Sequence, residues 1–231
     1  MNQIDPSTLF GRDHAETYET RFERMAPLRD ALQLLTRSAL RPLPETARIL
    51  CVGAGTGLEM RDLARANPGW HFTAVDPAPA MLDKCREAVA AAGLEDRCTL
   101  HDGYLDTLPD EDGLAFDGAT SLLVSHFILD REARRAYFAE IARRLKPGAR
   151  LAVADLASDM DSPAQGDVRA VWCDAQGIEP SGIAAYLDNL SGGVLLVAPD
   201  EQADLIAAAG FHRPVQIFQG GLIHGWLARR A

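Results

Sequence analysis

The chain has 231 residues, of which 47% are hydrophobic, so one large domain can bury a sizeable core without cross-links. Its formal net charge of −10 repels a phosphate backbone and disfavours a nucleic-acid partner. The four cysteines form no Cys-x-x-Cys pair, and no stretch has the pattern of a signal peptide or the length of a membrane span. Composition therefore predicts a cytoplasmic protein without a metal site or a membrane partner.

The first two thirds of the chain alternate between helical and strand patterns. Residues 8–38 carry apolar side chains every three or four positions, which predicts a helix that Pro42 and Pro44 end. The expected strands are 47–52, 70–75, 98–101, 118–125 and 150–156. One helix is expected to follow the glycines after the first strand and to end at Ala66, and two others are expected over 78–92 and 131–145. Lys146-Pro147-Gly148 is expected to form a turn. This alternation predicts a mostly parallel α/β sheet with helices on both faces.

The last third departs from the alternation. After a helix near 201–209, two β-like runs, 214–219 and 222–228, flank a Gly-Gly pair, which predicts a C-terminal antiparallel hairpin. Residues 158–199 predict helices that cover the sheet edge. Because no linker or repeat divides the chain, we expect a single domain over residues 1–231, with a helical lid at 1–45 and a helical insertion at 158–199.

The sharpest motif is Gly-Ala-Gly-Thr-Gly at 53–57, directly after an apolar strand. Glycines there let the chain turn tightly and let a ligand approach the backbone, and the following helix directs free N–H groups at that ligand. The second strand reaches Asp76 about 20 residues on, where a carboxylate can accept both ribose hydroxyl hydrogens. Asp76 is also placed to cap the helix that begins near Ala78. The pattern predicts a nucleoside site.

The spacing of the glycines separates two cofactor classes. A dinucleotide site has Gly-x-Gly-x-x-Gly, whose third glycine would fall at Leu58, whereas this chain has Gly-x-Gly-x-Gly. That spacing, with Asp76 and the C-terminal hairpin, resembles the class I S-adenosylmethionine-dependent methyltransferase family over nearly the whole chain. The resemblance implies a Rossmann-like sheet and S-adenosyl-L-methionine as the cofactor.

The resemblance also implies which residues bind the cofactor. The glycine turn would hold the methionine portion, the acid at the end of the second strand the ribose, and the residues after it the adenine; Met81 is equally expected in the core. An N-terminal helix would close over the cofactor as a lid. The implied residues are Tyr18, Gly53, Ala54, Gly55, Gly57, Asp76, Pro77, Met81, Gly103, Tyr104, Leu105 and Leu122.

Two positions depart from the family pattern. Tyr104 stands where the family commonly has an aspartate after the third strand, and Asp102 could supply that carboxylate by a one-residue shift. Cys51 stands two positions before the first glycine, where the family usually has an acid near the amino group of the cofactor. The charged head of the cofactor then needs a partner on another element, such as the N-terminal helices.

Chemistry is expected at the end of the fourth strand, because ligands bind outside the carboxyl ends of strands in open α/β sheets. His126 is the candidate general base, since an imidazole titrates near neutrality. A histidine here can also bind a loop carbonyl or cap the helix from Arg131. An acceptor pocket would be lined by aromatic residues, each of which is also expected in the core: Trp172, Tyr186, Phe218 and His224.

These features predict S-adenosylmethionine-dependent methyl transfer to a small-molecule acceptor, with the nucleophile open between oxygen, nitrogen, sulfur and carbon. Residues 22–27 and the tail 218–222 are similar to the carboxy-S-adenosylmethionine synthases, so an enzyme that modifies the cofactor itself is an alternative. An NAD-dependent oxidoreductase and a non-catalytic cofactor-binding scaffold are two others. The terminal edge strand permits a homodimer.

Overall fold

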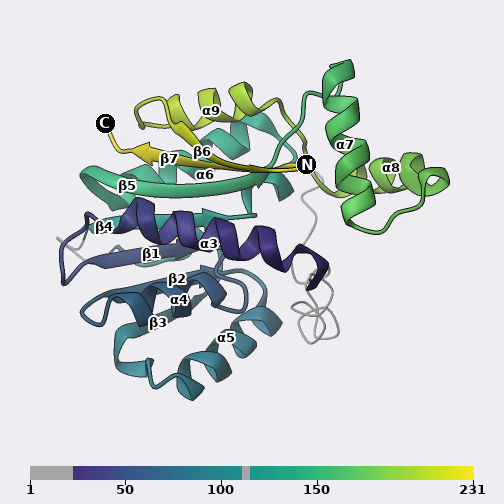
Figure 1. The fold of residues 1–231 in the computed structure, drawn as a ribbon. Helices are drawn as coiled ribbons and strands as arrows, with labels where there is room; N and C mark the ends of the chain where they lie inside the picture. Colours follow the sequence, from purple (N-terminus) through teal and green to yellow (C-terminus); the bar gives the residue numbers. More distant parts are fainter. Residues whose placement is uncertain (1–22, 111–114) are drawn as a thin grey trace.

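The computed structural model describes residues 23–110 and 115–231, and these form one sheet with helices packed on both faces (Figure 1). The seven strands lie in the order β3-β2-β1-β4-β5-β7-β6. The first five are parallel, and the sequence prediction of a terminal antiparallel hairpin is confirmed because β7 runs antiparallel to both β5 and β6. The strands are β1 (Arg48–Val52), β2 (His71–Asp76), β3 (Cys98–Asp102), β4 (Phe116–Leu122), β5 (Leu145–Leu156), β6 (Val215–Gly220) and β7 (Ile223–Arg229).

Helices cover the sheet in two layers, as the continuous apolar composition of the central strands requires. On β1, Leu50 and Val52 pack into a core shared with α6 and α9, whereas Ile49 and Cys51 pack into a core shared with α3, α4 and α5. The helices of the first layer are α3 (Ala26–Leu40), α4 (Leu58–Ala66) and α5 (Pro79–Ala91), and those of the second are α6 (Arg131–Arg144) and α9 (Pro199–Ala207).

Short 3-10 turns connect these elements: η1 (Glu23–Met25), η2 (Glu95–Arg97), η3 (Leu105–Thr107), η4 (Ser125–Phe127) and η5 (Pro180–Gly182). The expected helix over 8–38 is described only from Glu23 onward, where η1 leads into α3, and α3 ends before Pro42 as predicted. In the described part of the chain, no helix has both the length and the apolar character needed to cross a membrane.

Two sequence predictions about strand ends are wrong. The fourth strand does not extend to Ser125 but ends at Leu122, because Leu123 adopts a left-handed φ of 62° and the chain then enters η4. The predicted turn at 146–148 lies inside β5, which follows α6 directly. Gly148 keeps a left-handed φ of 74°, and the register of β5 on β4 shifts there, so the turn residues form an irregularity within the strand.

The insertion predicted at 158–199 contains α7 (Pro163–Ala175) and α8 (Ile183–Gly193). Figure 1 shows both helices (green) beyond the carboxyl ends of the parallel strands and away from the sheet. Its two ends meet, because the N–H of Ser158 donates to the carbonyl of Val197 at 2.9 Å. The insertion therefore leaves and rejoins the body of the protein at one place.

Candidate functional site

The glycine turn has the backbone geometry that its sequence predicts. Gly53, Gly55 and Gly57 have φ values of 68°, 54° and 75°, a region that favours glycine. A Cβ on Gly53 would lie 2.4 Å from a methyl carbon of Val124, so the end of β4 packs directly on the turn. Among residues 23–110 and 115–231, a Cβ on Gly55 would approach only the terminal methyl of Met81, at 3.4 Å, so this part of the chain leaves room for a ligand on that side of the turn.

Asp76 lies at the end of β2 and is tied to the turn by its own carboxylate. Oδ2 accepts the N–H of Gly55 at 2.8 Å and Oδ1 accepts the N–H of Ala78 at 2.9 Å, so Asp76 steadies the turn and the entry to α5. Each carboxylate oxygen keeps a further lone pair, so both can still accept a ribose hydroxyl. Burial is the main effect that raises the pKa of Asp76, and the charge of Asp102 adds to it.

The other implied cofactor residues lie along the same edge. Met81 is buried beside the glycine turn, and Pro77 is partly buried. After β3, Gly103 is held to β2 by a 3.1 Å bond to the carbonyl of Asp76, and Tyr104 is 46% exposed. The Leu105 side chain is buried in the core, so only its backbone can meet a cofactor. Tyr18 lies outside the described residues.

The end of β4 is strained. Leu123 is the one non-glycine residue with positive φ in the described ranges, and such a conformation costs on the order of 1–3 kcal/mol for a bulky side chain. Its N–H donates to the carbonyl of Ala154 at 2.6 Å, which holds the turn against β5. Leu122, partly buried, precedes this residue, and Val124, which packs on the glycine turn, follows it. The left-handed conformation of Leu123 turns the chain from β4 into η4, so that Val124 packs on the glycine turn and His126 follows it.

His126 lies in η4 against Asp155, near the end of β5. Its Nδ1 is 3.0 Å from Oδ1 of Asp155, and because an ionised carboxylate only accepts, Nδ1 carries the proton in this contact. The backbone N–H of His126 donates to the same oxygen at 3.1 Å, and the Ser125 hydroxyl donates to Oδ2 at 2.6 Å. Nε2 has no partner among residues 23–110 and 115–231. This arrangement orients an imidazole whose free nitrogen can accept a proton.

A second layer of polar side chains supports the pair. Gln202 from α9 donates to Oδ2 of Asp155 at 3.0 Å, and its own oxygen accepts from Arg134 of α6 at 3.1 Å. Arg134, fully buried, also donates to the carbonyl of Leu195 at 2.8 Å. The N–H of Leu195 in turn donates to the carbonyl of His126 at 2.8 Å. The insertion is thus bonded to the same turn that carries the histidine.

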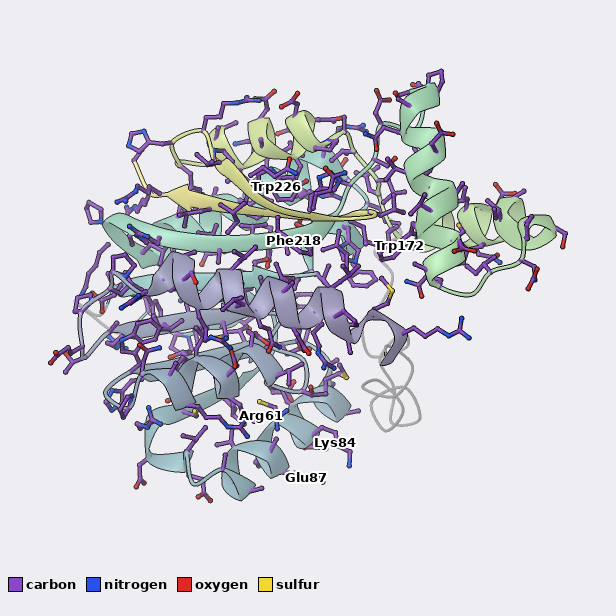
Figure 2. All side chains as sticks on the ribbon, viewed as in Figure 1. Arg61, Lys84, Glu87, Trp172, Phe218 and Trp226 are labelled. Atoms are coloured by element: carbon purple, nitrogen blue, oxygen red, sulfur yellow. The ribbon has the colours of Figure 1, made fainter. Side chains whose placement is uncertain are left out.

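The four candidate pocket residues divide between site and core. Trp172 of α7 packs on Gly221 of the terminal hairpin and donates to the hydroxyl of Tyr186 on α8 at 3.1 Å. Trp172, Tyr186 and Phe218 belong to one apolar cluster with Leu122 and Leu123. Figure 2 labels Trp172 and Phe218. His224 is 2% exposed and stacks on Trp226, and burial lowers its pKa to about 4, so it is neutral at physiological pH. Its ring nitrogens have no partner in the described ranges.

Sequence reasoning did not single out four polar residues of this region. Asp155 is the one acid in the apolar run 151–156, and that contrast was the signal that could have found it. Gln202 and Arg134 had no such signal, because polar residues are ordinary on amphipathic helices and only the fold turns these two inward. Glu59, the second residue of α4, was missed as well, although it follows the glycine turn directly.

A cavity of about 450 Å³ lies at the opposite edge of the sheet, between the amino ends of β1, β2 and β3. Arg48, His71 and Cys98 begin those strands and line it. Its position is remote from the glycine turn and from His126, which both follow the carboxyl ends of strands, where ligands bind in this architecture.

The comparisons with known proteins agree with this geometry. Residues 49–148 match the family model described as "Methyltransferase domain". An O-methyltransferase of Pyrenophora dematioidea is 30% identical over 198 residues, which cover 85% of this chain and 62% of the relative. A carboxy-S-adenosyl-L-methionine synthase of Dichelobacter nodosus is 28% identical over 192 residues, which cover 80% of this chain and 76% of the relative.

The solved structures agree on the fold. A putative O-methyltransferase from Nostoc punctiforme superposes with a TM-score of 0.67 at 18% identity, covering 94% of this chain and 59% of that one. The chain therefore spans about three fifths of the length of both this structure and the Pyrenophora relative.

Proposed function

We propose that the chain is a class I S-adenosylmethionine-dependent methyltransferase and that it transfers a methyl group to a hydroxyl oxygen of a small molecule. The observation that carries the choice of oxygen is the contact between His126 and Asp155 at 3.0 Å. A hydroxyl must lose its proton as it is methylated, and an oriented base contributes about 10²–10⁴-fold to such a step.

The residues at the carboxyl edge fit the cofactor. The open face of Gly55 accepts a ligand against the backbone, Asp76 offers two carboxylate oxygens to the ribose, and Met81 borders the same turn. The N-cap residue of α4 is Gly57, which has no side chain to cap the helix, so N–H groups of its first turn can bind a carboxylate. S-adenosylmethionine, when bound, supplies a methyl group already activated on a sulfonium.

The protein residues then supply orientation and proton transfer. Nε2 of His126 takes the proton of the acceptor hydroxyl as the oxygen attacks, and Asp155 stabilises the imidazolium that forms. Trp172, Tyr186 and Phe218 give an apolar wall that suits an aromatic or apolar acceptor and keeps water out. Relatives named O-methyltransferases support the same reaction.

The first test separates the cofactor from the acceptor. Calorimetry should show that S-adenosylhomocysteine binds the wild type and binds the Asp76→Asn variant about 10- to 100-fold more weakly, because charge-assisted hydrogen bonds are lost. Asp83→Asn is the matched control, since Asp83 lies exposed on α5 and pairs only with Arg86 among the described residues. A wild type that does not bind the nucleoside would overturn the cofactor assignment.

The second test addresses the acceptor. A panel of small phenols, amines and thiols should yield S-adenosylhomocysteine only with hydroxyl acceptors. Turnover confined to amines or thiols would contradict the proposed oxygen chemistry. Binding without turnover of any acceptor would instead favour the non-catalytic scaffold.

A second candidate is an enzyme that modifies the cofactor itself. The similarity to the carboxy-S-adenosyl-L-methionine synthase of Dichelobacter nodosus, over 80% of this chain, favours it. It predicts a small acidic second ligand and turnover without a methyl acceptor. Mass spectrometry of the cofactor after incubation with small carboxylic acids distinguishes the two, because only this candidate gives a heavier cofactor.

A further inference from the structure

The position where the family usually carries an acid is a neutral thiol in this chain. Cys51 is fully buried at the end of β1, and burial raises the pKa of its thiol well above the ordinary value. It cannot supply negative charge to a bound cation. An acid that pairs with the ammonium group at the methionine end of the cofactor would therefore have to come from another element.

Glu59 is an acid on another element, and it follows the same glycine turn that Cys51 precedes. It is the second residue of α4, directly after the glycine turn, and is partly buried. Its charge raises the pKa of Cys51 and of Cys85, and the charge of Asp76 raises its own. The geometry of the turn agrees: a Cβ on Gly57 would lie 2.6 Å from the sulfur of Cys85, and the N–H of Gly55 donates to Asp76 at 2.8 Å. The start of α4, which carries Glu59, therefore lies against α5 and the end of β2.

Few positive charges act on Glu59 among residues 23–110 and 115–231. Its charge interacts with the neutral thiols of Cys51 and Cys85 and with the carboxylate of Asp76, and its own backbone N–H, at the start of α4, favours the charged form. Arg61, two residues further along α4, favours the charged form. Burial dominates and raises the pKa of Glu59 to about 7. A cationic ligand at this place would favour the carboxylate.

The other acid of α4 is already committed. Both oxygens of Asp62 accept from Arg37 of α3, at 2.6 and 2.5 Å, so Asp62 is neutralised and held away from the glycine turn. Figure 2 shows Arg61 on α4, and Glu87 lies further along α5, where it pairs with Lys84 at the surface. Among the acids of α4 in the structure, only Glu59 is placed to meet the cofactor.

We propose that Glu59 binds the ammonium group of the methionine portion of S-adenosylmethionine, in the role that Cys51 cannot fill. The inference rests on the proposed function. With the ribose on Asp76 of β2 and the methyl group directed at His126 beyond β4, the amino-acid end must lie near β1 and the start of α4, because β1 lies between β2 and β4. Its carboxylate then meets the N–H groups of α4 and its ammonium meets Glu59.

The test compares two ligands that differ in the group at issue. S-adenosylhomocysteine carries the ammonium, and 5′-methylthioadenosine keeps the nucleoside but lacks the amino-acid end. Calorimetry on Glu59→Gln should show about 10- to 100-fold weaker binding of the first ligand and less than about twofold change for the second. Glu87→Gln, an exposed glutamate on α5, should change neither.

A second measurement reports the proton of Glu59 directly. Near pH 6 to 7, binding of S-adenosylhomocysteine to the wild type should release protons, because the ammonium converts a partly protonated Glu59 to its carboxylate. Binding heats in buffers with different ionisation enthalpies measure this release, and it should vanish in Glu59→Gln. Methylthioadenosine should release none from Glu59 in either protein.

The outcomes separate this inference from the proposed function. If the wild type binds both ligands and Glu59→Gln keeps its affinity for both, or loses both equally, the role of Glu59 is overturned while the cofactor site stands. A wild type that binds neither ligand overturns the cofactor site and this inference together. Selective loss of S-adenosylhomocysteine, with loss of proton release, establishes the role.

Discussion

The cofactor side of the carboxyl edge is assembled from segments close in sequence, whereas the acceptor side is assembled from distant ones. Asp76 bonds to backbone N–H groups 2 and 21 residues away. Asp155 instead receives side chains 29, 30 and 47 residues away, from η4 and α9. One side depends on backbone conformation and the other on long-range side-chain contacts, so the two should respond differently to substitution.

The largest effect is expected from His126→Asn. The variant keeps a polar side chain but loses the base, so methyl transfer to a hydroxyl should fall by about 10²–10⁴-fold. The affinity for S-adenosylhomocysteine should stay within about twofold, because the cofactor side is built separately. Single-turnover rates and calorimetry on the same variant test this. Equal losses in both would show that the two sides are not independent.

A methyl group in the glycine turn should break the cofactor side by a steric route. Gly53→Ala forces a side chain into a φ of 68° and within 2.4 Å of Val124, which should destabilise the protein by about 2–4 kcal/mol. Urea unfolding measures the loss. Gly192→Ala is the control: Gly192 lies in α8, no atom of residues 23–110 or 115–231 lies within 4 Å of its added Cβ, and the variant should stay within about 1 kcal/mol of the wild type. Similar midpoints for the two variants would refute the packing argument.

Removal of Gln202 should weaken the acceptor side without touching the cofactor side. Gln202→Leu leaves Asp155 and Arg134 each short of one buried partner, which should cost about 1–3 kcal/mol. We also expect the rate of methyl transfer to fall while the affinity for S-adenosylhomocysteine is kept, because Asp155 loses a hydrogen bond that helps to orient His126. An unchanged rate, with only a lower unfolding midpoint, would reduce Gln202 to a structural role.

The pH dependence of stability sharpens the comparison on the cofactor side. The pKa of Glu59 is about 7 when folded and lower when unfolded, so the native state binds more protons between these values, and stability falls as pH rises through that window. The difference in the free energy of unfolding between Glu59→Gln and the wild type should move in favour of the variant by roughly 1–3 kcal/mol from pH 5 to pH 8. A gap independent of pH would mean that Glu59 is not held in this state.

Sequence patterns predicted the conformation of the glycine turn and the position of Asp76 because the determinants of both are local. Glycine is the residue type that most readily adopts a positive φ, so the glycine spacing indicates where the chain turns. Asp76 is found from its position at the end of the next strand, about 20 residues after the turn. The mostly parallel sheet was predicted from the alternation of helical and strand patterns along the chain. The terminal hairpin was predicted from two β-like runs around a Gly-Gly pair, and both signals are local as well. The end of β4 was missed because Leu123 has no local preference for a left-handed φ, and only its tertiary contacts impose one.

The acceptor side could be predicted only in part. His126 was found by its type and its place after a strand, but its partner Asp155 and the links through Gln202 and Arg134 depend on how α6 and α9 pack. The partner for the cofactor ammonium was expected on the N-terminal helices, and we now propose Glu59 instead. That difference arises because a surface acid and a ligand-binding acid look alike in sequence until the burial of the first turn of α4 is known.

Because Ser158 and Val197 are joined by a hydrogen bond, the segment between them, which contains α7 and α8, begins and ends at one place on the body of the protein. A graft that keeps both ends and the Leu195 contacts could replace α7 and α8 by helices of other lengths, since the junction spans one hydrogen bond and leaves every strand in register. Natural or engineered recombination at this junction would change the acceptor wall while leaving the donor machinery intact.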